Sequence, residues 1–311
     1  MLGHLMARSY QAIKALATRQ VSFECDRIPY HFDNVPLRKL LNWLAVETSI
    51  YFKPGHPWGW PTHLQIEPTN RCNLRCALCP VTMGMDRPSG DMEFNIFKKI
   101  IDEIGDYVFL ILLWDWGEPF LNPSIYEMIS YAKQKGIKLV SSTNGHLFKK
   151  IEQADKLIAS GLDSIIFAMD GISQETYEPY RQGGSLESVL QAIRTVVARR
   201  RELNSRTPFV NLRFIVMKHN EHEIPKLKEL AKSLGVDALT LKTLNPVNQD
   251  FYSENKSEVR IKNEFLPQDH HYHRFKYDST GQNVIRVRRN PCKQAWNNPV
   301  IHWSGAVCSC T

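Results

Sequence analysis

The 311-residue chain contains no long hydrophobic run. One of its most apolar stretches is Val108–Leu113, far short of the roughly 20 apolar residues that a membrane-spanning helix needs. The N-terminal residues also lack the apolar core of a signal peptide. We therefore expect a cytoplasmic protein.

Cysteine is scarce, and the sequence has neither low-complexity segments nor an internal repeat. Seven cysteines in 311 residues do not make a disulfide scaffold. Three of them crowd into residues 72–79 and three more lie at positions 292, 308 and 310, which indicates metal binding, whereas Cys25 is isolated and expected in the core. With 43% hydrophobic and 23% charged residues, the chain suits one large folded domain with an appendage.

Acidic residues are missing from the last part of the chain. The formal charge is +7, and residues 281–311 hold arginines and a lysine but no acid. A second basic run covers residues 194–206. We expect solvated basic surfaces here and no nucleic-acid partner, with contact to an anionic membrane surface as the alternative.

From residue 64 onward, short β-rich runs alternate with amphipathic helical patterns. The expected strands are Leu64–Pro68, Val108–Trp114, Ile137–Ser142, Ser164–Met169, Phe209–Met217 and Ala238–Leu244. The expected helices lie near Asn95–Ile104, Ser124–Gln134, Lys150–Ser160, Leu186–Glu202 and Glu223–Leu234. Such an α/β alternation predicts a parallel sheet that curls into an open or closed barrel, with its active site at the C-terminal ends of the strands.

Three regions follow from this pattern. Residues 1–60 form an N-terminal helical extension, with helices expected at Tyr10–Arg19 and Leu37–Phe52. Residues 61–245 form the core barrel, and residues 246–311 form a C-terminal extension. The helix at Tyr10–Arg19 is expected to pack on the core, with peripheral contact to a membrane as the alternative.

The cysteine loop carries the strongest chemical signal. Cys72, Cys76 and Cys79 have the spacing C-x3-C-x2-C, which supplies a thiolate to three irons of a four-iron cluster. The loop has no fourth ligand. Structural zinc closes its shell with four protein ligands, whereas a catalytic metal keeps one position open, so the pattern favours catalysis. A zinc knuckle or a ferredoxin-like loop is the alternative.

The segment from Gln65 through Cys79 resembles the start of a radical SAM enzyme. That resemblance implies a partial (β/α)6 TIM-type barrel holding a 4Fe–4S cluster, whose open iron binds S-adenosylmethionine (AdoMet). It implies that an electron, from a donor such as flavodoxin or ferredoxin, cleaves AdoMet to methionine and a 5'-deoxyadenosyl radical that abstracts hydrogen from substrate. In relatives an aromatic residue usually precedes the third cysteine, where this chain has Leu78.

Two motifs after the next strands extend the resemblance. Trp116-Gly117-Glu118-Pro119 is similar to the family's glycine-glycine-glutamate-proline turn, so Gly117 and Glu118 are expected to hold the methionine ammonium. Trp116 replaces the usual first glycine, and a buried turn carboxylate is the alternative. Ser142, Thr143 and Asn144 resemble the segment that contacts ribose hydroxyls and the methionine carboxylate, with an ordinary capped turn as the alternative.

Arg181 is the candidate guanidinium for the methionine carboxylate. It lies in a stretch, Met169 to Gly184, that resembles members with a cysteine-rich C-terminal extension. A guanidinium binds a carboxylate through two N–H groups, which suits this role. A surface arginine is the alternative.

The tail resembles the opening of a SPASM or Twitch extension, in which cysteines around a hairpin begin an auxiliary iron-sulfur site. Cys292 and Cys310 fit that spacing, and Cys308 is an additional candidate ligand. A second iron-sulfur cluster is therefore expected, either completed in a longer protein or built from an unusual ligand set. A hairpin with buried free cysteines is the alternative.

The resemblance implies an oxidoreductase or a carbon-bond-forming enzyme of the radical SAM type. Its expected partners are AdoMet, an electron donor, and a substrate that is either a peptide or protein side chain or a small molecule. A non-catalytic iron-sulfur electron carrier is the alternative, but it leaves Glu118, Asn144 and Arg181 without a task.

Overall fold

The computed structural model describes residues 11–245, 264–274, 276 and 294–309. Within these residues, no helix is long and apolar enough to cross a membrane. The N-terminal residues 11–18 are helical, and α2 spans Leu37–Phe52, so both expected N-terminal helices are present. The domain boundaries at residues 60/61 and 245/246 stay predictions.

The described residues form one large sheet with strand order β10-β9-β3-β4-β5-β6-β7-β8. Its parallel strands β3 to β8 are His63–Ile66, Leu110–Leu112, Lys138–Thr143, Ser164–Ala168, Phe209–Val216 and Ala238–Thr243. Each of these strands pairs with the next one along the chain, which confirms the predicted parallel α/β fold. Strand β4 is shorter than predicted, because the chain already leaves the sheet before Trp114.

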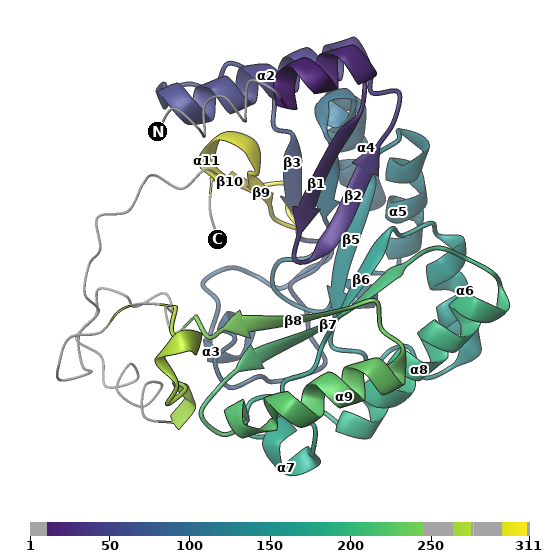
Figure 1. Ribbon diagram of the computed structural model, residues 1–311, viewed down its shortest axis with the longest axis vertical. Coiled ribbons are helices and arrows are strands. Elements are labelled where there is room, and N and C mark those ends of the chain that lie inside the picture. Colours follow the sequence, from purple (N-terminus) through teal and green to yellow (C-terminus); the bar gives the residue numbers. More distant parts are fainter. Residues whose placement is uncertain (1–10, 246–263, 275, 277–293, 310–311) are drawn as a thin grey trace.

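Helices pack along the outer face of the curved sheet (Figure 1). They are α4 Phe94–Ile104, α5 Ile125–Gln134, α6 Ile151–Ala159, α8 Leu186–Glu202 and α9 Ile224–Leu234, with short α3 Pro80–Met83 and α7 Gln174–Tyr177 in the connections. Alternate strand residues such as Ile111, Leu139 and Ile165 are fully buried among these helices. The fold therefore has its main core between the sheet and its outer helices.

A β-hairpin that the sequence analysis did not predict packs on the other face of the sheet. Its strands are β1 Val21–Cys25 and β2 Ile28–Phe32. Leu110, Val140 and Ile166, the strand residues between those that face the helices, belong to a second core cluster with this hairpin. The N-terminal extension thus covers part of the inner face of the sheet.

The tip of this hairpin is fixed to the last two parallel strands. Asp26 and Arg27 form the turn, with φ angles of 53° and 60°. The Asp26 carboxylate forms ion pairs with Arg213 on β7 and Lys242 on β8. The backbone carbonyl oxygen of Asp26 accepts a hydrogen bond from Asn211 Nδ2 at 2.6 Å. The hairpin therefore joins the N-terminal extension to the strands that end near the cysteine loop.

The C-terminal hairpin extends the opposite edge of the sheet. Strand β9 (Val300–Ile301) pairs in parallel with β3, and β10 (Val307–Cys308) pairs antiparallel with β9. The short helix α11, Gln294–Asn297, precedes them. The hairpin predicted from the tail is present next to the strand that leads into the cysteine loop.

Candidate active site

The cysteine loop leaves the C-terminal end of β3 and ends where α3 begins. Cys76 is buried, while Cys72 and Cys79 are half-buried, and all three are free thiols. The backbone N–H groups of Arg75 and Ala77 donate to carbonyl oxygens of Gln182 and Tyr180, at 3.0 and 2.9 Å. The loop is therefore held against the segment that also contains Arg181.

The turn after β4 packs directly on the entry to this loop. Gly117 has φ +87°, and a Cβ at this position would lie 2.7 Å from the carbonyl oxygens of Thr69 and Arg71. The backbone N–H of Glu118 donates to the same Arg71 oxygen at 2.8 Å. A glycine is therefore required at position 117, whereas the preceding position accommodates Trp116.

Glu118 is a buried carboxylate that connects two strand ends. Its Oε1 accepts a hydrogen bond from Thr143 Oγ1 at 2.8 Å, and its Oε2 accepts one from the Asn144 backbone N–H at 2.7 Å. Burial raises the pKa of Glu118 to about 7, against the lowering effect of these hydrogen bonds. The carboxylate thus positions the segment after β5, and its contact with a methionine ammonium stays a prediction.

Asn144 and Arg181 each direct a donor towards a cysteine sulfur. Asn144 Nδ2 lies 3.8 Å from Cys72 Sγ. Arg181 Nη1 lies 3.6 Å from Cys76 Sγ, while its Nε donates to Asp170 at 2.6 Å. Because Asp170 is fully buried, it fixes the guanidinium beside the loop.

A cavity of about 280 Å³ brings the predicted residues together. It is lined by Cys72, Cys76, Cys79, Gly117, Glu118, Ser142, Thr143, Asn144 and Arg181. These residues come from the ends of different strands, as expected for a site at the C-terminal edge of a parallel sheet. The same cavity is also lined by Trp114, Asp115 and Arg213, which the sequence analysis did not single out.

The cysteine loop offers three thiols from one short segment, which suits ligation of three irons of a four-iron cluster. Among the described residues, Glu67, Asp115 and His302 form a separate group of potential metal ligands, whose ligand atoms all lie within 4.8 Å of one another.

The protonation state of the cysteine thiols also depends on whether a metal is bound. Burial raises the pKa of Cys72 to about 11. Without metal this sulfur is therefore a protonated thiol at neutral pH. Iron ligation would deprotonate it, since a bound cation reverses the local preference for the neutral form.

A second polar network, missed by the sequence analysis, links this site to the C-terminal hairpin. Glu67 is fully buried, and its two carboxylate oxygens accept hydrogen bonds from the two Nη groups of Arg87, both at 2.6 Å. His302 Nδ1 lies 3.4 Å from Glu67 Oε2, and His302 Nε2 lies 3.4 Å from Cys308 Sγ. The sequence signal was an acidic residue inside the expected strand Leu64–Pro68, but the partners of Glu67 are distant in sequence.

Asp115 lies between this network and the cavity. Burial and the neighbouring Glu67 raise its pKa to about 7.

Cys308 is the one predicted auxiliary ligand whose surroundings are described, because Cys292 and Cys310 lie outside the described residues. Their grouping with Cys308 stays a prediction.

Comparisons with known proteins identify the family of this chain. The sequence profile of the radical SAM superfamily matches residues 66–231. The chain is 30% identical, over 80% of its length and 70% of the relative's, to the tungsten-containing aldehyde ferredoxin oxidoreductase cofactor-modifying protein of Pyrococcus furiosus. It is 32% identical to the AdoMet-dependent heme synthase of Methanosarcina barkeri, over 63% of this chain but only 54% of that enzyme.

Solved structures show the same fold. The crystal structure of Streptococcus suis SuiB bound to S-adenosylmethionine superposes with a TM-score of 0.58 at 15% identity, covering 90% of this chain and 66% of SuiB. The profile match covers more than half of the chain, including the cysteine loop and the motifs around Glu118, Asn144 and Arg181. The chain therefore belongs to the radical SAM superfamily, whose members use a 4Fe–4S cluster and AdoMet.

Proposed function

We propose that this protein reductively cleaves AdoMet at a 4Fe–4S cluster held by Cys72, Cys76 and Cys79, and uses the resulting radical on an organic substrate. The observation that carries the proposal is that these cysteines line one cavity with the residues expected to bind AdoMet. An electron carrier would not need that set of side chains.

When both groups are bound, the reduced cluster supplies the electron that cleaves AdoMet into methionine and a 5'-deoxyadenosyl radical. The chain's own residues bind and orient. Arg181 and Asn144 direct N–H groups towards Cys76 and Cys72, and such donors stabilise the more negative, reduced cluster. Glu118 fixes the Thr143–Asn144 backbone that faces the cavity.

The substrate class that we propose is a peptide or protein side chain, or a small molecule. A solved neighbour, SuiB, is bound to the precursor peptide SuiA, whereas relatives by sequence include heme synthases. The electron donor that we propose is a flavodoxin or a ferredoxin. The reaction is an oxidation or the formation of a carbon bond.

Spectroscopy of the reconstituted cluster tests the proposal. The protein, reconstituted anaerobically and reduced, should show an electron paramagnetic resonance signal that changes on addition of AdoMet, because AdoMet binds the open iron. Cys25→Ala, which alters a cysteine outside the cavity, should behave like the wild type. A fully loaded cluster whose signal does not change on addition of AdoMet would instead identify an electron carrier.

A further inference from the structure

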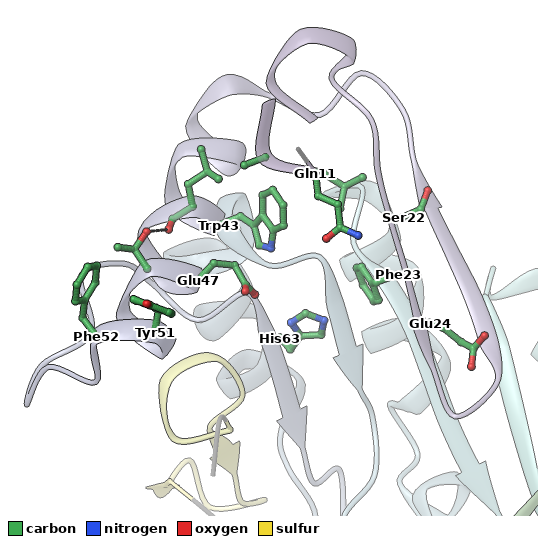
Figure 2. Close-up of a pocket in the computed structure, with 13 residues that line it drawn as sticks. Gln11, Ser22, Phe23, Glu24, Trp43, Glu47, Tyr51, Phe52 and His63 are labelled. Carbon is green, nitrogen blue, oxygen red and sulfur yellow. Dashed lines mark hydrogen bonds between the residues drawn. The ribbon is translucent and has the colours of Figure 1, made fainter. Parts of the chain in front are cut away.

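A second and larger cavity lies at the other end of the sheet. Its volume is about 680 Å³, and it is bounded by the 11–18 helix, β1, α2 and His63 (Figure 2). His63 is the first residue of β3, whereas the cysteine loop follows the last. Among the described residues, the two cavities share no lining residue. This cavity is therefore a site separate from the cysteine site.

Aromatic rings form much of its wall. Phe23, Trp43, Tyr51 and Phe52 all line it. Tyr51 and Phe52 are 51% and 64% exposed, and their rings meet edge to face at 5.0 Å. Exposed aromatic side chains gathered around a concave surface are typical of a binding site, because each offers an apolar face to a ligand.

Among the described residues that line the cavity, the charged side chains are all acidic. They are Glu24 and Glu47, and the described lining contains no lysine or arginine. Figure 2 shows the Glu47 carboxylate turned into the cavity between Trp43 and His63, with Glu24 further out at one side. Within the described part of the chain, neither glutamate has a side-chain hydrogen bond or ion pair.

His63 adds no positive charge. Burial lowers its pKa to about 4, so its ring is neutral at pH 7. An acidic cavity is unexpected on a chain whose net charge is +7, since most of its surface would repel a cation. The charge in the cavity therefore selects for a positively charged ligand.

We propose that this cavity is an accessory binding site for an organic cation, a primary ammonium carried on an apolar or aromatic body. The ammonium pairs with Glu47, and the apolar body lies against Trp43 and Tyr51. Ammonium ions bind both to carboxylates and to the faces of aromatic rings, and the lining offers both. The site does not depend on AdoMet cleavage.

Three probes with one apolar body and different head groups test this proposal. We would titrate the full-length, anaerobically purified protein with phenylbutylammonium, phenylbutanol and phenylbutyrate by calorimetry. The ammonium should bind about tenfold more tightly than the alcohol, and the carboxylate should bind least. Equal affinity of all three, or no binding of the ammonium, would overturn the proposal.

Variants assign the binding to this cavity. Glu47→Gln keeps the shape of the side chain and should remove the preference for the ammonium over the alcohol. Tyr51→Ala, at an exposed position, should weaken the binding of both the ammonium and the alcohol. Glu229→Gln on α9 is the matched control and should leave all affinities unchanged. An ammonium preference that survives Glu47→Gln would show that the cation binds elsewhere.

Discussion

At the scale of single residues, Glu118 shows how one carboxylate organises the site. It is 1% exposed, and its two oxygens bond to Thr143 and Asn144 on the neighbouring strand end. The motif alone suggested a ligand contact, because a sequence does not show which backbone donors surround a carboxylate. The structure adds a second role, because Glu118 also positions Thr143 and Asn144 through these hydrogen bonds.

Glu118→Gln tests this role. Whichever oxygen the amide nitrogen replaces, a backbone donor loses its acceptor, either the Asn144 N–H at Oε2 or the Phe120 N–H at Oε1. The expected cost is about 1–3 kcal/mol in the free energy of unfolding. AdoMet affinity should fall about tenfold, since 1.4 kcal/mol corresponds to that factor. The iron content should stay at the wild-type level. Denaturation, equilibrium dialysis with AdoMet and iron analysis measure the three quantities. Loss of iron without loss of stability would show that Glu118 supports the cluster instead.

His63 predicts a specific pH dependence of stability. Burial lowers its pKa from 6.5 to about 4 in the folded protein. Between these values the unfolded chain binds a proton that the folded chain does not, so the free energy of unfolding falls as the pH drops from about 6.5 towards 4. In His63→Gln this fall should be smaller, as measured by denaturation at a series of pH values. His271→Gln, at a 94% exposed side chain, should follow the wild type; equal slopes in all three proteins would contradict the prediction.

At the scale of elements, the β1–β2 hairpin shows which features could be predicted from the sequence and which could not. Its alternating apolar and polar residues in 21–25 and 28–32 were a strand signal. The two-residue turn, Asp26-Arg27, lacks the asparagine-glycine or aspartate-glycine pair that marks most such hairpins. The parallel strands and outer helices were predictable because their periodic patterns are long. The ion pairs of Asp26 with β7 and β8 were not, because they join residues far apart in sequence.

Asp26→Asn tests how the hairpin is held. Asparagine also tolerates the positive φ of this turn, so the change removes mainly the charge. The free energy of unfolding should fall by about 1–3 kcal/mol, because two cations lose their partner. In double-mutant cycles, coupling to Arg213 should exceed coupling to Lys242, since these side chains are 15% and 39% exposed. Equal or absent coupling, measured by chemical denaturation, would contradict this account.

At the scale of the whole molecule, the two hairpins extend the barrel core in different ways. The β1–β2 hairpin covers part of the inner face and reaches Arg213, which lines the cavity with the three cysteines. The β9–β10 hairpin lengthens the sheet beside β3 and carries Cys308. Parallel strands place the ends of β3 to β8 at one edge, which is why motifs scattered over a hundred residues meet in one site.

Iron analysis tests the predicted auxiliary cluster. A protein with the Cys72–Cys79 cluster alone would hold about four irons, and a second cubane would raise the count to about eight. Replacing Cys292 and Cys310 together by alanine should lower the iron content but leave AdoMet cleavage without substrate intact. An unchanged iron content in this double variant would show that the C-terminal cysteines do not bind a cluster.

Cys72, Cys76 and Cys79 are proposed to hold the cluster that cleaves AdoMet. The most direct test of this proposal is the yield of 5'-deoxyadenosine and methionine after dithionite reduction of the anaerobically reconstituted protein, measured by liquid chromatography and mass spectrometry. The wild type and Cys25→Ala should form both products, and Cys76→Ala should form neither, because one iron loses its thiolate. Absence of 5'-deoxyadenosine from a fully loaded wild-type protein, or its undiminished formation by Cys76→Ala, would contradict the account.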